Sequence, residues 1–287
     1  MAAISLSTDY YQQFDANPSI PVPAEGYGGW RRGVVEVSRE HTALVVMHAW
    51  DCGLPGEYPG WERAVEYQPR ARQILQDVFP PLLAAARAGG MPVMHVVGGR
   101  DYYSHLPGYQ GRNAAAVDHV LHRAVPDRVS IELEAFRSKN VFTGDHNRRD
   151  VEAGFARMDF APQAHPAGSE CIAENGVQLA DACIQRGINH LIYIGFAINW
   201  CLLMSPGGMV DMRRYGFICS TVQEAVTAVE NRETARDELE KRQALWRVSL
   251  EFGFVFHTDN LVAALQRSPR PKGSAPNVCG FTTNIRG

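Results

Sequence analysis

The sequence predicts an α/β protein in which a doubly wound, mainly parallel β-sheet is flanked by helices on both faces. Five short apolar runs are rich in Val, Ile and aromatic residues, which is typical of central strands buried on both faces. Helical segments alternate with them, and this alternation indicates parallel strands joined by helical crossovers. The runs occupy residues 43–48, 92–97, 190–195, 216–220 and 252–257.

Three segments between or beside these runs predict helices. Residues 80–90 begin with two prolines and end with two glycines, the residue types that favour the two ends of a helix. Residues 171–187 place Ile172, Leu179 and Cys183 near one face before Gly187. Residues 230–253 are charged at first and then amphipathic. The expected architecture is therefore a three-layer α/β/α sandwich.

The chain predicts one elaborated domain over residues 41–267 rather than two domains. Residues 1–40 are rich in Pro, Gly and Tyr and indicate an arm across the surface. Residues 100–170 combine Pro, Gly, His and Asn with weak periodicity, and we interpret them as an insertion that forms a lid or a subunit interface. Residues 268–287 indicate an exposed tail.

Composition argues against several classes of protein. The net charge is -3 and no long run of Lys or Arg occurs, so a nucleic-acid partner is not expected. No apolar stretch approaches the roughly 18–20 residues that span a bilayer, and no signal peptide is recognised. The six cysteines are scattered without a CxxC pair. We expect a cytoplasmic protein with reduced thiols and a small-molecule substrate.

Functional sites in open α/β sheets lie at the carboxyl ends of the strands. The strand at 190–195 is followed by "FAINWC", which ends in Cys201 and precedes a partly helical segment. A thiol at a helix N-terminus has a lowered pKa and is available as a nucleophilic thiolate. The alternative is that Cys201 is a small buried hydrophobe, and its position alone favours this second interpretation.

The residues around Cys201 resemble a known family. A strand followed by G-x-x-x-x-x-C and a helix is similar to the isochorismatase-like cysteine hydrolases, and the resemblance runs from about Thr42 to Leu265. It implies the same fold and the hydrolysis of a small amide, ureide or carbamoyl amide through a thioester. The other segments that carry it are "ALVVMHAWDCGLP", "PPLLAAARAGGMPVMHVV", "FRSKNVF" and "DMRRYGFICSTVQEAV".

The resemblance assigns roles to individual residues. Cys201 is the implied nucleophile, and Lys139 is the lysine that stabilises the thiolate and the carbonyl oxygen. A cis peptide bond is expected between Ala197 and Ile198, with backbone N–H groups near Ile198 and Cys201 directed at the oxyanion.

The proton acceptor departs from the family pattern. The family ends its first strand with Asp, whereas this chain has His48 there and Asp51 three residues later. An imidazole of near-neutral pKa is a suitable base for a thiol, so His48 is placed slightly ahead of Asp51. The third alternative is an inactive family member that serves as a binding or scaffold protein.

The loops that flank Cys201 supply the expected substrate-binding residues, and their aromatic character suits a planar or apolar substrate. Isochorismatase-type vinyl-ether hydrolysis is a weaker alternative, because that reaction depends on the missing Asp. Many family members assemble as dimers or tetramers, so the resemblance implies a homo-oligomer. The expected pocket residues are Trp50, Phe196, Asn199 and Trp200.

No metal and no cofactor are expected. Nicotinamidases of the family carry an Asp/His metal cluster after the second strand, where this chain has only Asp101 and His105. Asp118, His119 and His122 follow later, but such residues are more often a polar helix face. A Rossmann-type nucleotide binder is also not expected, because "GGR" at 98–100 lacks G-x-G-x-x-G.

Overall fold

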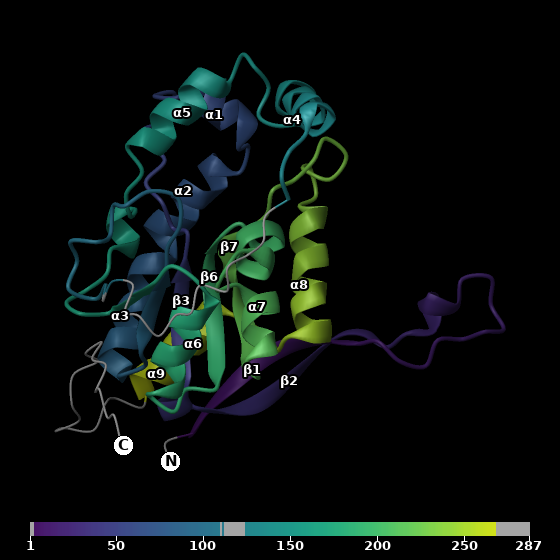
Figure 1. The fold of residues 1–287 in the computed structure, drawn as a ribbon. Helices are drawn as coiled ribbons and strands as arrows, with labels where there is room; N and C mark the ends of the chain where they lie inside the picture. Colours follow the sequence, from purple (N-terminus) through teal and green to yellow (C-terminus); the bar gives the residue numbers. More distant parts are fainter. Residues whose placement is uncertain (1–2, 110, 112–123, 268–287) are drawn as a thin grey trace.

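The computed structural model describes residues 3–109, 111 and 124–267, which form one eight-stranded sheet (Figure 1). The strand order is β2-β1-β8-β7-β6-β3-β4-β5, and all neighbours from β8 to β5 run parallel. The predicted fold class is therefore confirmed. The strands are β1 (Ala3–Gln12), β2 (Gly29–Ser38), β3 (Thr42–Met47), β4 (Val93–Val96), β5 (Cys171–Ala173), β6 (His190–Phe196), β7 (Ile218–Thr227) and β8 (Val255–Phe256).

Helices cover both faces of the sheet, as the apolar strands predict. Every residue of β3, β4 and β6 is buried. One apolar core joins this sheet to α6 (Gly176–Ile184), α7 (Met209–Arg214) and α8 (Leu239–Glu251). A second core on the opposite face joins it to α2 (Gln68–Asp77), α3 (Phe79–Gly89) and α9 (Thr258–Arg267). The two layers are seen in Figure 1.

Two predicted helices begin later than the sequence indicates. The segment at 171–187 starts with the edge strand β5, and α6 follows Asn175, whose side chain accepts the N–H of Gln178. The segment at 230–253 is helical only from Leu239. The carboxylate of Glu230 accepts the N–H groups of Glu240 and Lys241, so it caps the start of α8.

The amino-terminal segment differs from the expected surface arm. β1 and β2 form an antiparallel ladder from Ala3↔Ser38 to Gln12↔Gly29, and β1 also pairs with β8. Only residues 13–28 between the two strands extend from the body of the protein (Figure 1). The strands were missed because the Pro- and Gly-rich connection dominates the composition of this segment.

The 100–170 segment contains α4 (Arg128–Asn140) and α5 (Arg148–Ala156). α5 packs on α1 (Pro59–Ala64), where a Cβ on Gly154 would lie 2.0 Å from the Trp61 ring. None of the residues in α4 is buried. The expected tail at 268–287 lies outside the described residues. None of the helices in the described part of the chain has the length and apolar character needed to span a bilayer.

Candidate active site

The candidate site lies where β3 and β6 end side by side. The two strands are parallel neighbours, and their register pairs Met47 with Gly195. His48 therefore follows one strand at the same edge of the sheet where Ala197 follows the other. This is the carboxyl edge at which α/β sheets bind ligands.

Cys201 sits in a short π-helical turn, η4 (Ile198–Leu202), directly after β6. The carbonyl of Ala197 accepts the N–H groups of Trp200 (3.2 Å) and Leu202 (3.1 Å). Ala197 and Ile198 are only 1% and 0% exposed, so the turn is anchored in the core. Cys201 itself is partly exposed beside that core.

The cis peptide bond lies one residue earlier than predicted, between Phe196 and Ala197 rather than between Ala197 and Ile198. Ala197 is extended, and its carbonyl is already the first acceptor of the helical turn. The bond that follows it therefore has the trans geometry of a helix.

The expected lowering of the Cys201 pKa is wrong. Burial raises the pKa of this thiol, and hydrogen bonds from the Ser205 side chain and the Ala197 backbone offset the rise only in part. The turn has five residues, which is too short for a strong helix dipole. Within the described residues, no charged side chain contributes to the shift. The thiol is therefore protonated near neutral pH and needs a base.

His48 is the candidate base at this edge, but its imidazole does not have the expected near-neutral pKa and is a weaker proton acceptor than an ordinary histidine. Burial of the ring lowers the pKa of His48 to about 4, so the imidazole is neutral near pH 7. The ring shares a hydrogen bond with the Val97 backbone, while Nδ1 has no partner among the described residues. The proton therefore lies on Nε2, and the lone pair of Nδ1 is buried without a hydrogen-bond donor, Cys201 included, among the described residues.

The position of the His48 ring is fixed by its neighbours. The residue has a φ of 50°, an uncommon conformation for a residue other than glycine. Its ring stacks on Trp50 with 4.6 Å between centroids and 16° between planes. Trp50 Nε1 donates a hydrogen bond to the Tyr102 hydroxyl at 2.8 Å. Burial raises the pKa of Tyr102 to about 12, so this phenol stays neutral.

Asp51 is occupied in its own loop. Its carboxylate accepts the N–H of Gly53 at 2.9 Å and lies 3.5 Å from the Arg157 guanidinium. These contacts stabilise the turn after β3.

Tyr67 and Cys52 belong near the site but were not predicted. Burial raises the pKa of Tyr67, and Cys52 and Cys201 are the next largest causes of the rise, so this phenol lies near both thiols. Burial also raises the pKa of Cys52, to about 12. Cys52 is visible in the loop after the first strand, whereas Tyr67 reaches the site only through the packing of α2.

Two of the expected pocket residues have structural roles. Phe196 is 3% exposed and packs against Phe79 (5.8 Å) and Tyr67 (6.4 Å). The side-chain amide of Asn199 donates to the Val229 carbonyl (2.8 Å) and accepts the Val229 N–H (2.9 Å). Asn199 therefore ties the cysteine turn to the segment after β7.

Trp200 is 42% exposed and meets the edge of Phe142 at 5.7 Å. This contact joins the segment after α4 to the cysteine turn. Lys139 is exposed near the end of α4, and the described residues show no contact between Lys139 and Cys201. A role for Lys139 stays a prediction of the resemblance.

A metal centre has little support in the described residues. Asp101 and His105 are both exposed, and no group of three metal-binding side chains occurs in the part of the chain that the structure describes. Asp118, His119 and His122 lie outside those residues.

The fold and the site define a doubly wound α/β protein with a cysteine and a histidine at neighbouring strand ends. Solved structures with a similar fold include a putative isochorismatase from Burkholderia xenovorans (TM-score 0.49, 18% identity, covering 81% of this chain and 91% of that chain). A cysteine hydrolase from Pseudomonas syringae is a further example (TM-score 0.47, 14% identity, covering 81% of this chain and 95% of that chain). A nicotinamidase from Acinetobacter is another (TM-score 0.42, 13% identity, covering 77% of this chain and 98% of that chain). No protein-family model and no curated protein matches the chain.

Proposed function

We propose that this chain is an isochorismatase-like cysteine hydrolase that cleaves a small amide, ureide or carbamoyl amide. The observation that carries the proposal is the pair of groups at the ends of β3 and β6. His48 offers a neutral ring with an unpartnered Nδ1, and Cys201 offers a partly exposed thiol at the same edge of the sheet. The sequence motif around Cys201 supports the same class.

The proposed reaction begins with proton transfer from Cys201 Sγ to His48 Nδ1. The sulfur attacks the substrate carbonyl, and the C–N bond breaks as the amine leaves with the proton from His48. Water then adds to the thioester, the C–S bond breaks, and the thiol regains its proton. His48 acts first as a base and then as an acid in each half of the cycle.

Backbone N–H groups near Ile198 and Cys201 are proposed to stabilise the oxyanion. Their turn is anchored by the buried Ala197 and Ile198, which supports a fixed geometry. Lys139 receives no step in this mechanism, because its exposed place on α4 does not support contact with the thiol.

We propose that three aromatic side chains form the walls around the substrate: Trp50, Trp200 and Tyr67. Trp50 is held by His48 and Tyr102, and Trp200 presents an exposed ring beside Cys201. Aromatic walls of this kind favour a planar substrate such as an aryl amide or a ureide.

A non-catalytic binding protein is the second candidate. The raised pKa of Cys201, without a cation among its causes, favours it specifically. Such a protein would bind the same planar ligands but would not turn them over.

The experiment that separates the two candidates is turnover of a substrate panel. Primary amides, ureides and carbamoyl amides are incubated with the wild type and with Cys201→Ala, and the released amine or ammonia is measured. The proposal expects turnover of at least one class by the wild type and none by the variant. Equal release by both proteins, or none by either, would contradict it.

We also propose that the protein is a homo-oligomer in which α4 lies at the subunit interface. Val129, Leu133 and Phe136 are 52%, 62% and 63% exposed, and their spacing places them on one face of that helix. An apolar helix face of this kind is typical of a protein–protein contact.

A further inference from the structure

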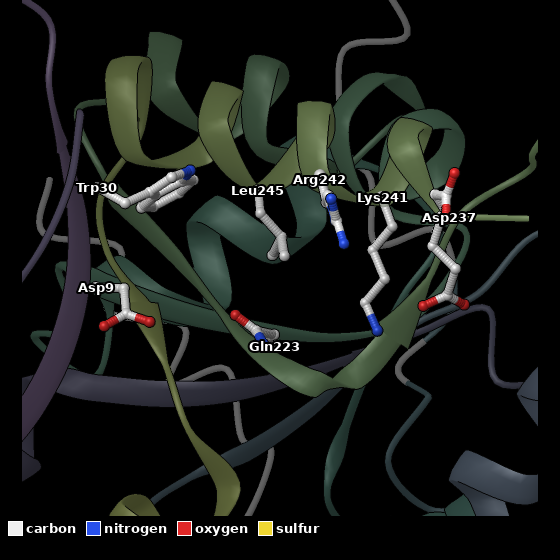
Figure 2. Close-up of a pocket in the computed structure, with 8 residues that line it drawn as sticks. Asp9, Trp30, Gln223, Asp237, Lys241, Arg242 and Leu245 are labelled. Carbon is white, nitrogen blue, oxygen red and sulfur yellow. The ribbon is translucent and has the colours of Figure 1, made fainter. Parts of the chain in front are cut away.

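A cavity of about 550 Å³ lies between the β1–β2 ladder and α8 (Figure 2). It does not define a ligand class, because its lining combines acidic and basic side chains: Asp9, Asp237, Glu238, Lys241 and Arg242. Helix α8 also packs beside the cysteine turn η4, so this cavity is not separated from the candidate active site. A more definite arrangement surrounds His48.

The His48 imidazole lies in a slot between two loops. One loop follows β3 and carries His48 and Trp50, and the other is residues 98–102 after β4. Trp50 covers one face of the imidazole, with 4.6 Å between the ring centroids. On another side, a Cβ added to Gly98 would lie 3.1 Å from Nε2, so the glycine leaves room that a larger residue would take.

The Val97 backbone determines which nitrogen of the His48 ring carries the proton. The Val97 N–H already donates to the Ala173 carbonyl at 2.9 Å, so the Val97 carbonyl is the group that hydrogen-bonds to His48. A carbonyl can only accept, and Nδ1 has no partner among the described residues, so this bond needs the proton on Nε2. The slot therefore selects one tautomer as long as the ring keeps its position.

Tyr102 joins the two walls of this slot. Its hydroxyl oxygen accepts the indole N–H of Trp50 at 2.8 Å. Burial raises the pKa of Tyr102, and a second hydrogen bond, from the Gly98 backbone, acts against that rise, so the Gly98 N–H is its donor. The Tyr102 oxygen thus holds both the ring that covers His48 and the glycine that faces Nε2.

The Tyr102 ring is itself anchored by packing. It meets Phe160 edge-on at 5.0 Å and Tyr103 at 5.1 Å between ring centroids. Phe160 in turn forms a β-bridge with Trp50. These contacts do not include His48, so the hydroxyl has a position of its own from which it can fix the slot.

We propose that Tyr102 is a positioning residue for His48, whose hydroxyl keeps Trp50 and Gly98 in place and so holds the imidazole in its Nε2–H form. The inference rests on the proposed function in one respect, the role of His48 as the base. Tyr102 acts through its neighbours and takes no part in bond making. The loop at 98–102, which lacks a nucleotide-binding fingerprint, gains a role in the candidate site.

The test is ¹⁵N NMR of the full chain labelled at histidine, recorded between about pH 8 and pH 5, with His48→Gln to assign the His48 signals. In the wild type we expect separate signals for a protonated Nε2 and an unprotonated Nδ1 down to about pH 5, because burial lowers the pKa of His48 to about 4. In Tyr102→Phe the ring is loosened and hydrated, and we expect it to be at least about half protonated at about pH 5.

Tyr103→Phe is the matched control, because it removes the neighbouring hydroxyl, which donates to Glu174 at 2.7 Å. It should leave the His48 signals as in the wild type. Gly98→Ala is a second variant that keeps the Tyr102 hydroxyl but places a methyl group 3.1 Å from Nε2, so the ring signals of His48 should change. A thermal unfolding curve for each variant shows that the compared proteins are folded.

Unchanged His48 signals in Tyr102→Phe would overturn the proposal, and so would equal changes in Tyr102→Phe and Tyr103→Phe. On a substrate that the wild type hydrolyses, kcat/KM should fall toward about pH 5 in Tyr102→Phe but not in Tyr103→Phe, because a protonated His48 accepts no proton. Identical pH profiles in these two variants would overturn it as well. A wild type without turnover contradicts the proposed hydrolysis, and the NMR signals alone then decide the role of Tyr102.

Discussion

Met47 and Gly195 are register partners on neighbouring parallel strands, and a Cβ on Gly195 would lie 1.9 Å from the Met47 carbonyl oxygen. The φ of Gly195 is +129°, which side chains rarely adopt. Both observations concern the strand ends that carry His48 and Cys201. The close approach of the two backbones therefore sets the spacing of the candidate site.

Gly195→Ala is expected to destabilise the protein by at least about 3 kcal/mol, because it adds a backbone clash to a strained φ. Gly216→Ala is the matched control: its φ is +89°, but nothing lies within 4 Å of the added methyl. The control should cost only about 1 kcal/mol. Chemical denaturation measures both, and equal losses would show that the strand contact is not the cause.

His48→Gln is expected to lower kcat/KM by roughly 10²–10⁴-fold, because it removes the proposed proton acceptor. Asp51→Asn should lower it by less than about tenfold, since Asp51 is held by Gly53 and Arg157. Steady-state kinetics on the best substrate of the panel measures both variants. A larger loss in Asp51→Asn than in His48→Gln would reverse the assignment.

The stability of the fold is expected to fall between about pH 6.5 and pH 4. Burial lowers the pKa of His190 to about 4, so the native state resists protonation that the unfolded chain accepts. The contribution is complete above the unfolded pKa and is lost as the pH falls toward the folded pKa. At about pH 5 the loss from His190 is about 2 kcal/mol.

Urea unfolding of the wild type and His190→Gln at about pH 7 and pH 5 measures this loss. The variant should show the smaller difference between the two pH values. His257 is a control of opposite sign, because Glu224 and Asp9 raise its pKa against burial. Its contribution is present at low pH and is lost as the pH rises through the folded pKa. An unchanged pH dependence in His190→Gln would contradict the assignment.

Replacing Leu133 and Phe136 of α4 together by Asp is expected to convert the oligomer into a smaller species, because the charges would be buried at the interface. Val34→Asp is the control, since Val34 is 69% exposed on β2, away from α4. Light scattering after size-exclusion chromatography reports the mass. A monomeric wild type, or an unchanged mass in the double variant, would contradict the proposed interface.

The central strands could be predicted from sequence because each is a continuous apolar run, as in residues 43–48 and 190–195. β1 and β2 were missed because they are half exposed and alternate, and because β1 is stabilised by pairing with β8 far along the chain. Helix α9 was missed for a similar reason. It is amphipathic, and its apolar face is buried only by packing against α3.

The candidate site was predicted where it depends on strand order and missed where it depends on packing. His48 and Cys201 follow neighbouring strands, so topology alone brings their segments to one edge. The nearness of Tyr67 to both thiols depends on how α2 packs against the sheet. The local sequence pattern does not predict that packing. The raised pKa of Cys201 likewise follows from burial rather than from its place before a helix.

The most direct test of the central claim compares the alkylation rates of Cys201 and Cys52 by iodoacetamide near pH 7, followed by peptide mass spectrometry. Both thiols are partly exposed and both have a raised pKa, so Cys52 is an internal control. If His48 activates Cys201, Cys201 reacts at least about tenfold faster than Cys52, and this advantage is lost in His48→Gln. Equal rates in the wild type, or an advantage that persists in His48→Gln, would contradict the proposed pair.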